Sequence, residues 1–458
     1  MTTPTRDIDE AAPRISGKRD LVERLESGCK PSSAWRIGTE HEKFGFIENG
    51  LAPLPYHGEA SIKTLLDGLA SRYGWSPILE GEHVIGLKKG LASVSLEPGG
   101  QFELSGAPLE TIHETCAEIT EHLRETASIS DPIGIAFLAL GFSPIWSLED
   151  TPTMPKGRYG IMRSYMDRVG RLGRQMMFRS CTVQSNLDFS SESDMVKKMR
   201  VSIALQPIAT ALFANSPFAE GRTNGFQSYR AHVWTDTDPD RTGTLPFVFE
   251  TGYGFERYVD YALDVPMYFV RRGGQYVDCS GLSFRDFMAG RLSVLPGELP
   301  AMDDFDDHIS TIFPEVRLKT FLEMRGADAG PQSSLCALSA FWAGILYDGA
   351  ALDGAWELVK NWTAEEREAM RRSVPALGLR APIGATSVQA VALQALSLAR
   401  GGLRRRARLN SSGDDETIFL LPIEEIAESG INFAERLLAR YHGPWNRDLR
   451  HAFAEVRF

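Results

Sequence analysis

The chain has 458 residues, of which 43% are hydrophobic, and its formal net charge is −11. That charge argues against a general nucleic-acid-binding protein, which needs clustered positive charge to contact phosphates. The longest apolar run, from Ile133 to Phe142, is too short to span a bilayer. The five cysteines are widely spaced and fit neither a disulfide scaffold nor a zinc ribbon.

The first ten residues are polar and acidic and lack the apolar core of a secretory signal, so a cytoplasmic protein is expected. The sequence contains no low-complexity tract, no internal repeat and no linker-like stretch rich in Ser, Gly or Pro. A single domain over residues 1–458 is therefore expected, with a mostly helical lobe from about 333 to 458.

The first predicted helix runs from about Arg19 to Glu26, and the strand that follows it, from Ile37 to Phe46, carries two acids. Side chains alternate along a strand, so Glu40 and Glu42 face the same side. Neighbouring carboxylates repel each other, and burial strengthens the repulsion, so a cation is expected between them. The alternative is a solvated edge strand whose acids face water.

A helix from Ser61 to Arg72 precedes a predicted hairpin, in which strands over 93–97 and 101–105 are joined by a Pro-Gly-Gly turn. Within this hairpin, Glu97 and Glu103 face the side opposite to the apolar residues. The next predicted elements are a helix over 108–129, a buried strand over 133–140, and a loop followed by a helix over 154–173.

The strand from Cys181 to Phe189 is expected to have one polar but mostly uncharged face, which carries Gln184, Asn186 and Asp188. A solvated face more often carries Lys and Glu. This face is therefore predicted to form the floor of a site.

Ser191 should begin a long helix to about Asn215, which Pro207 should kink or divide. A last alternating strand is predicted from Arg317 to Arg325, with Glu323 on its polar side. Alternation within the strands favours an antiparallel sheet with one polar, concave face and helices behind it, an α+β architecture. Helical stripes are predicted over 335–346, 388–398 and 423–441.

The polar strand faces collect oxygen donors without any cluster of His and Cys at zinc spacing, so the expected cation is Mg²⁺, with Mn²⁺ as an alternative. Arg158, Arg230 and Arg325 offer forked donors for carboxylates or phosphates. Acids that bind metal, opposite arginines, suit phosphoryl transfer. For any single arginine, a structural ion pair is an equal alternative. Walker and dinucleotide-binding motifs are missing, so ATP would bind through metal ions on the sheet.

Long segments in this order resemble the plant-type glutamate–cysteine ligases of plants and proteobacteria, from about Leu21 to the last residue. The matching segments are Ile37–Phe46, Leu96–Gly106, Met154–Tyr159, Cys181–Gln184, Asn186–Phe189, Trp234–Asp238, Asp264–Phe269 and Glu323–Asp328.

The resemblance implies ATP-dependent joining of the γ-carboxylate of L-glutamate to the amine of L-cysteine through γ-glutamyl phosphate, the first step of glutathione synthesis. It also implies a glutamine-synthetase-like catalytic sheet. Two alternatives stay open: a ligase of the same mechanism that uses another amine, and a non-catalytic relative that binds metal or ligand. The transit peptide of plant members is missing from the sequence, which favours a bacterial cytoplasmic enzyme, and the resemblance leaves a homodimer open.

The resemblance also implies roles for single residues. The acids expected to hold Mg²⁺ are Glu40, Glu42, Glu97, Glu103 and Glu323. Glu42 and Arg325 are expected to be catalytic, with Arg325 facing phosphate, whereas Arg158 and Arg230 would hold glutamate. Gln184 and Asn186 stand where more distant relatives carry a metal-binding His and are expected to contact substrate, and Tyr268 is expected to line the amine pocket.

Cysteines form the last expectation. On residue chemistry alone, Cys116 and Cys336 are small buried hydrophobes, as free cysteines usually are in a reducing cytoplasm. The resemblance implies instead that they form a redox-sensitive disulfide, with Cα atoms about 4.4–6.8 Å apart. Cys29, Cys181 and Cys279 are expected to stay free.

Overall fold

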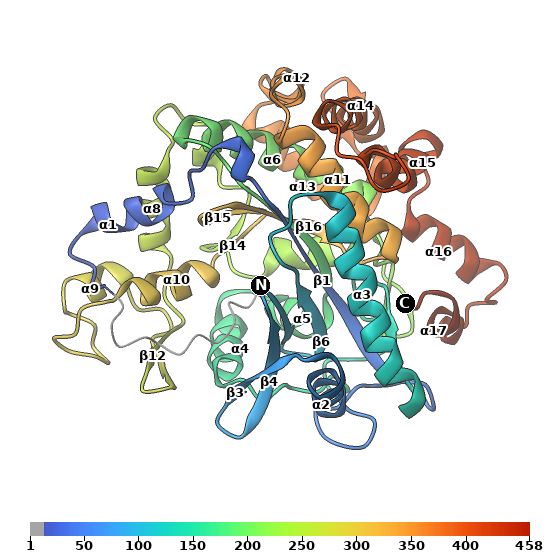
Figure 1. Ribbon diagram of the computed structural model, residues 1–458, viewed down its shortest axis with the longest axis horizontal. Helices are drawn as coiled ribbons and strands as arrows, with labels where there is room; N and C mark the ends of the chain where they lie inside the picture. Colours follow the sequence, from blue (N-terminus) through green and yellow to red (C-terminus); the bar gives the residue numbers. More distant parts are fainter. Residues whose placement is uncertain (1–12) are drawn as a thin grey trace.

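The computed structural model describes residues 13–458, and its central element is a ten-stranded sheet (Figure 1). Every pairing within this sheet is antiparallel. Eight strands follow one another in the order β15 (Val316–Leu318), β16 (Leu322–Asp328), β8 (Thr182–Leu187), β1 (Ile37–Ile47), β6 (Gln101–Ser105), β5 (Ala92–Leu96), β4 (His83–Lys89) and β3 (Ser76–Glu80). Strands β2 (Ala52–Pro53) and β7 (Ile135–Leu138) also pair with β1.

Strand β1 lies in the middle of the sheet, between β8 and β6, and every residue in it except Ile47 is buried. The alternation of side chains places Glu40 and Glu42 on one face and Thr39, His41 and Lys43 on the other. The solvated edge strand, considered as an alternative from the sequence, is therefore excluded.

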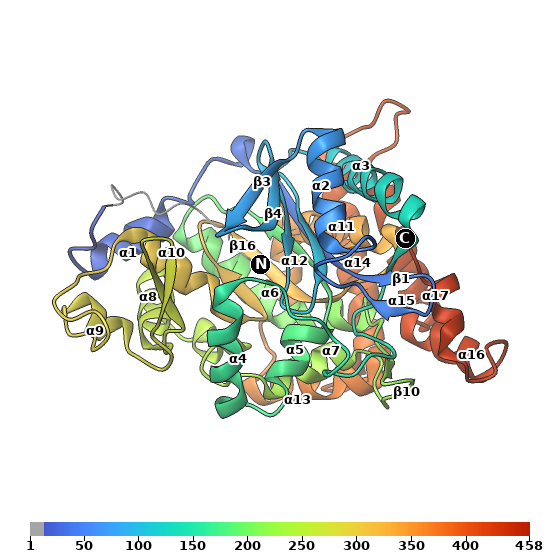
Figure 2. The same ribbon diagram turned by 90° about the horizontal axis from the view of Figure 1, so that it is seen from below.

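Helices cover both faces of this sheet. The face that carries Thr39 packs against α3 (Ile112–Ser130) and α11 (Gln332–Leu346). Lys43 Nζ lies 2.9 Å from His122 Nε2 of α3, and Thr39 Oγ1 lies 2.5 Å from Ser339 Oγ of α11. In Figure 2, α2 (Ile62–Tyr73) and α3 lie at the top, and α4 (Gly157–Val169) and α5 (Gly173–Arg179) lie at the bottom. The predicted α+β fold with a large antiparallel sheet is confirmed.

Two further groups of elements surround the sheet. Residues 255–310 form α8 (Phe255–Asp264), β12 (Phe269–Arg272), β13 (Gln275–Asp278), α9 (Phe284–Met288) and α10 (Met302–Ser310), against which α1 (Lys18–Glu26) packs. The chain after 331 is mostly helical, with α11, α12 (Gly349–Val359), α13 (Ala364–Leu377), α14 (Val388–Arg406), α15 (Leu421–Ser429), α16 (Phe433–His442) and α17 (Ala452–Glu455). This region is therefore mostly helical, whereas its treatment as a lobe of a single domain over the whole chain stays a prediction.

Several boundaries differ from those predicted. The strand expected over 317–325 is a hairpin, because the chain turns at residues 319–321 and β15 pairs back on β16. The stripe over 423–441 is two helices, because Gly430 takes a left-handed conformation (φ 70°) and ends α15. Helix α6 (Glu192–Leu212) runs through Pro207 as a single helix. Helix α3 begins at Ile112, after the capping residue Thr111, and not at residue 108.

Over residues 13–458, no single helix is long and apolar enough to cross a membrane. The pair α11 and α12, bent by 90°, passes that test by length and composition only.

Candidate active site

The pairing of the strands places the predicted acids on one face of the sheet. Glu42 lies directly opposite Glu103, and Glu40 lies opposite Gln184. Asn186 lies opposite Glu323 and donates an amide hydrogen bond to Glu40, 2.7 Å away. The polar face predicted from alternation is therefore one continuous surface across β6, β1, β8 and β16.

Glu97 reaches this face from the turn between β5 and β6. The turn requires glycine twice: Gly100 has a φ of 84°, and a Cβ on Gly99 would lie 2.2 Å from the carbonyl oxygen of Phe178. Gln101 then ties the hairpin to the end of α5 by donating to the carbonyls of Met177 and Ser180.

Burial and mutual repulsion leave the central acids reluctant to ionise. Burial, together with Glu103 and Glu97, raises the pKa of Glu42 to about 8, and burial with Glu323 and Glu103 raises the pKa of Glu40 to about 7. Burial also raises the pKa of Glu97. Oε2 of Glu40 and Oε1 of Glu97 are buried without a hydrogen-bond partner.

These oxygens fit a hard divalent cation, which prefers oxygen ligands and would reverse the pKa shifts. Within residues 13–458, however, no three acidic, histidine or cysteine side chains converge closely enough to hold a metal ion as they stand. Metal binding would therefore draw the carboxylates together or share its coordination with substrate oxygens.

Glu323 differs from the other acids because Arg317 holds it. Arg317 Nε and Nη2 lie 2.5 and 3.1 Å from the two carboxylate oxygens, and both side chains are fully buried. Burial alone would raise the pKa of Glu323, but the charges of Arg317, Lys319 and Arg325 hold it well below its usual range. Since both oxygens are engaged, its role as a metal ligand stays a prediction that requires the carboxylate to turn.

A cavity opens on this polar face, with about 670 Å³ of unfilled space including its mouth. Glu42 and Glu97 line its floor, and Arg158 of α4, Arg230 of α7 (Tyr229–Val233) and Arg325 of β16 line its sides. Within residues 13–458, neither Arg158 nor Arg230 forms an ion pair, and the Nε of each is buried without a partner. In the described part of the chain, a structural ion pair therefore explains neither of these two arginines.

Gln184 and Asn186 hold other site residues in place. The side-chain oxygen of Gln184 accepts a hydrogen bond from Arg325 Nη1 at 2.7 Å. The side-chain amide of Asn186 donates a hydrogen bond to Glu40. Tyr268 is not brought to the cavity: it is buried against the guanidinium of Arg241, 3.8 Å from the ring centre, and does not line the wall.

Sequence reasoning missed the apolar wall of the cavity. The wall is formed by side chains of α4 and α5, of the residue that follows α7, and of strand β14 (Phe313–Pro314). These side chains are Tyr159, Met162, Met176, Met177, Trp234 and Phe313. It also missed Arg317, whose partner Glu323 lies only six residues away along the chain.

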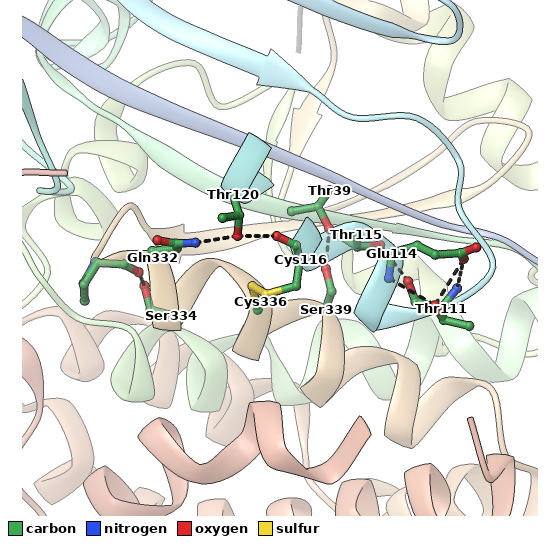
Figure 3. Close-up of a disulfide and its surroundings, with 11 residues drawn as sticks. Thr39, Thr111, Glu114, Thr115, Cys116, Thr120, Gln332, Ser334, Cys336 and Ser339 are labelled. Carbon is green, nitrogen blue, oxygen red and sulfur yellow. Dashed lines mark hydrogen bonds between the residues drawn. A yellow bond between two sulfur atoms is a disulfide. The ribbon is translucent and has the colours of Figure 1, made fainter. Parts of the chain in front are cut away.

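The disulfide expected from the resemblance is present. Cys116 on α3 and Cys336 on α11 are bonded, with Cα atoms 5.6 Å apart, and Cys29, Cys181 and Cys279 are free. Figure 3 shows two further hydrogen bonds of α11: Gln332 donates to Thr120 of α3 at 2.6 Å, and Ser339 is hydrogen-bonded to Thr39 of β1. Because Thr39 precedes Glu40, the bridge is connected to the polar face of the sheet through α11.

We expect non-reducing peptide mapping to link Cys116 to Cys336, and Cys336→Ser to lower the free energy of unfolding by about 3–5 kcal/mol, because the bridge restricts the unfolded chain. Urea unfolding of the oxidised protein and the variant measures this difference. Cys279→Ser, which removes a buried free thiol, is the control. Equal midpoints for the oxidised protein and Cys336→Ser would contradict the prediction.

The raised pKa values predict how metal and pH act together. Between the usual carboxyl value of 4.5 and about 7–8, the metal-free folded protein holds protons on Glu40 and Glu42 that the unfolded chain releases. Its stability should therefore fall as pH rises through this window. Mg²⁺ needs the ionised carboxylates, so its stabilisation should be larger at pH 8 than at pH 6. Thermal midpoints in EDTA and in Mg²⁺ at both pH values measure this, and an equal or smaller shift at pH 8 would refute it.

Comparisons with known proteins agree with this geometry. A model of glutamate–cysteine ligase family 2 (GCS2) matches residues 36–455. A chloroplastic glutamate–cysteine ligase of Medicago truncatula is 54% identical over 455 residues, covering 99% of this chain and 88% of the relative. The corresponding Arabidopsis thaliana protein is 55% identical over 455 residues, covering 99% and 85%.

Solved structures support the fold at low sequence identity. A crystal structure of a glutamate–cysteine ligase from Francisella tularensis in complex with AMP covers 92% of this chain and 89% of its own, with a TM-score of 0.54 and 11% identity. A bifunctional glutathione synthetase from Pasteurella multocida has a TM-score of 0.52 at 12% identity, covering 96% of this chain and 54% of its own.

The relatives correct one expectation. The sequence predicts a bacterial cytoplasmic enzyme, but the relatives of Medicago truncatula, Arabidopsis thaliana, Nicotiana tabacum and Solanum lycopersicum are all named as chloroplastic proteins. The expectation of a cytoplasmic location is therefore contradicted. With the family model over residues 36–455 and about 55% identity along the whole chain, this protein belongs to glutamate–cysteine ligase family 2 and is an enzyme of that family.

Proposed function

We propose that the enzyme joins the γ-carboxylate of L-glutamate to the amine of L-cysteine, with ATP as the second substrate and γ-glutamyl phosphate as the intermediate. The observation that carries this proposal is the convergence of Glu42 and Glu97 with three arginines on one cavity. The names of the relatives supply the two amino acids.

In this proposal, Arg158 and Arg230 bind the α-carboxylate of glutamate, because neither has an ion-pair partner within residues 13–458 and both line the cavity. Guanidinium groups bind carboxylates through two parallel hydrogen bonds. Glutamate held in this way would place its γ-carboxylate toward the acidic floor.

The chemistry has two steps. An oxygen of the γ-carboxylate attacks the terminal phosphorus of ATP, and the bond from that phosphorus to the bridging oxygen of ADP breaks. The amine of cysteine then attacks the acyl carbon, the bond to the phosphate oxygen breaks, and the amine loses a proton. Arg325, held by Gln184, stabilises the negative charge of the phosphoryl group in transfer.

The residues expected to hold Mg²⁺, or Mn²⁺, remain Glu40, Glu42, Glu97, Glu103 and Glu323, a set made only of carboxylates. When bound, such ions supply charge neutralisation and orient the phosphate oxygens. Asn186 would keep Glu40 in position for this role through its amide hydrogen bond.

The test is a product assay with a panel of amines. Enzyme, L-glutamate, L-cysteine, ATP and Mg²⁺ should yield ADP and γ-glutamylcysteine in equal amounts. Faster release of ADP with an amine other than cysteine would replace cysteine as the acceptor. Formation of neither product would overturn the proposal.

A further inference from the structure

Asp328 ends β16, the strand that also carries Glu323 and Arg325, and the proposed chemistry assigns it no role. Its side chain is 1% exposed and does not line the cavity. No lysine or arginine of residues 13–458 forms an ion pair with it. A buried carboxylate without such a partner is costly unless hydrogen bonds satisfy its oxygens, so its donors indicate what it holds in place.

Three uncharged donors satisfy the carboxylate of Asp328. Oδ2 accepts hydrogen bonds from the backbone N–H of Asn215 at 2.9 Å and from the hydroxyl of Ser216 at 2.6 Å. Oδ1 accepts a hydrogen bond from the hydroxyl of Ser228 at 2.8 Å. The carboxylate also needs glycine beside it, because a Cβ on Gly141 would lie 2.5 Å from the Cβ and Cγ of Asp328. Asp328 therefore ties two separate stretches of chain, at 215–216 and at 228, to the end of β16.

The two serine hydroxyls connect Asp328 to the main chain of Arg230. The Oγ of Ser216 accepts a hydrogen bond from the backbone N–H of Arg230 at 3.2 Å. The Oγ of Ser228 accepts one from the backbone N–H of Ala231 at 3.2 Å, so Ser228 is the capping residue of α7. Because Arg230 is the second residue of this helix, Asp328 holds the turn of α7 from which the Arg230 side chain extends.

Strand β16 also holds the guanidinium of Arg230. Its Nη2 donates to the carbonyl of Arg325 at 2.8 Å, whereas its Nε is buried without a partner. Burial raises the pKa of Asp328, and the positive charge of Arg230 opposes that shift. The same strand therefore holds Arg230 at two points, the main chain through Asp328 and the guanidinium through Arg325. Since a paired contact with a carboxylate depends on the orientation of the guanidinium, a displacement of α7 would weaken that contact.

We propose that Asp328 is a positioning residue for substrate binding, which fixes the first turn of α7 so that Arg230 presents its guanidinium to the α-carboxylate of glutamate. This inference rests on the proposed role of Arg230 in binding glutamate. Because Asp328 does not line the cavity, its loss should weaken the binding of glutamate and leave the binding of ATP and the chemical step unchanged. An acid that only stabilised the fold would not distinguish between the two substrates.

Asp328→Asn tests this inference, because the carboxamide keeps the size of the side chain but replaces one acceptor oxygen with an NH₂ donor. At least one of the three donors then loses its acceptor. We expect the KM for L-glutamate to rise about tenfold, whereas kcat and the KM for ATP should change less than about twofold. Steady-state kinetics with each substrate varied in turn measure these constants.

Asp194→Asn is the matched control. Asp194 also accepts hydrogen bonds from a backbone N–H and a hydroxyl, both of Ser190, but it lies near the start of α6 and outside the cavity lining. This variant should leave kcat and both KM values unchanged.

A double-mutant cycle distinguishes positioning from a purely structural role. Arg230→Ala leaves no guanidinium to be positioned, so adding Asp328→Asn to it should lower kcat/KM for glutamate by less than about twofold further. Ser216→Ala removes the hydroxyl that connects Asp328 to the Arg230 main chain, and it should raise the KM for glutamate about threefold.

The inference is overturned if Asp328→Asn folds and keeps the normal KM for glutamate, or if it raises the KM for ATP equally. An Asp328→Asn effect as large in Arg230→Ala as in the unchanged enzyme would also overturn it. If Asp328→Asn does not fold, a normal KM for glutamate in Ser216→Ala overturns it. A normal KM for glutamate in Arg230→Ala would instead refute the proposed role of Arg230 in binding glutamate, and this inference with it.

Discussion

Glu42→Gln should lower kcat by about 10²–10⁴, because one carboxylate that binds metal contributes several kcal/mol of transition-state stabilisation. The carboxamide keeps the shape of the side chain and can still accept the hydrogen bond from the Thr182 backbone N–H, which lies 2.9 Å from Glu42 Oε2. The fold should therefore survive. Steady-state rates at saturating substrates, with circular dichroism to check folding, measure the effect.

The matched control for this variant is Glu121→Gln, which makes the same change on the exposed surface of α3. Its rate should equal that of the unchanged enzyme. Near-normal turnover by Glu42→Gln would remove Glu42 from the metal site.

Arg325→Lys should lower kcat by a factor of about 10³, although the substitution conserves the positive charge. Arg325 donates to Gln184 at 2.7 Å and lies 3.5 Å from Glu323, so its planar fork is oriented before substrate binds. A lysine has no such fork and would leave Gln184 without its donor. Arginines that stabilise a transferring phosphoryl group contribute effects of this size.

Arg371→Lys is the control, because Arg371 pairs with Glu315 and Glu368 away from the cavity. It should keep the normal rate. If Arg325→Lys raised only the KM for glutamate and left kcat unchanged, then Arg325 would bind substrate and would not act on the phosphoryl group.

Strand alternation was enough to predict most of the acidic face. The period of two residues in 37–46 and 101–105 fixes which side chains share a face, and pairing then places Glu42 opposite Glu103. The neighbouring strand that carries Gln184 and Asn186 follows the same rule. Local pattern and sheet geometry agree here, so the sequence suffices.

The hairpin of β15 and β16 shows where local pattern fails. A straight strand over 317–325 would separate Arg317 from Glu323 by about 20 Å, at roughly 3.3 Å per residue. The chain instead turns at Lys319, Thr320 and Phe321, none of which is a residue that favours turns. The ion pair between Arg317 and Glu323 follows from that turn and was therefore missed.

The apolar wall could not be predicted for a different reason. Met162, Met176 and Met177 have the spacing of core residues on short helices, and a methionine that faces a cavity has the same sequence pattern as one that faces the core. Only the packing of α4 and α5 over the acidic face distinguishes the two. The ring of Tyr268 lies against Arg241 and outside the lining of this cavity, so its place in an amine pocket stays a prediction.

Transfer of isotopic oxygen tests the central claim most directly. L-glutamate labelled with ¹⁸O in the γ-carboxylate should pass one labelled oxygen to inorganic phosphate for each γ-glutamylcysteine formed, because that oxygen attacks the phosphorus of ATP and leaves with it. Mass spectrometry of the released phosphate and nucleotides detects it. If ¹⁸O appeared in AMP, or if the released phosphate contained no ¹⁸O, an acyl phosphate formed in this cavity would be contradicted.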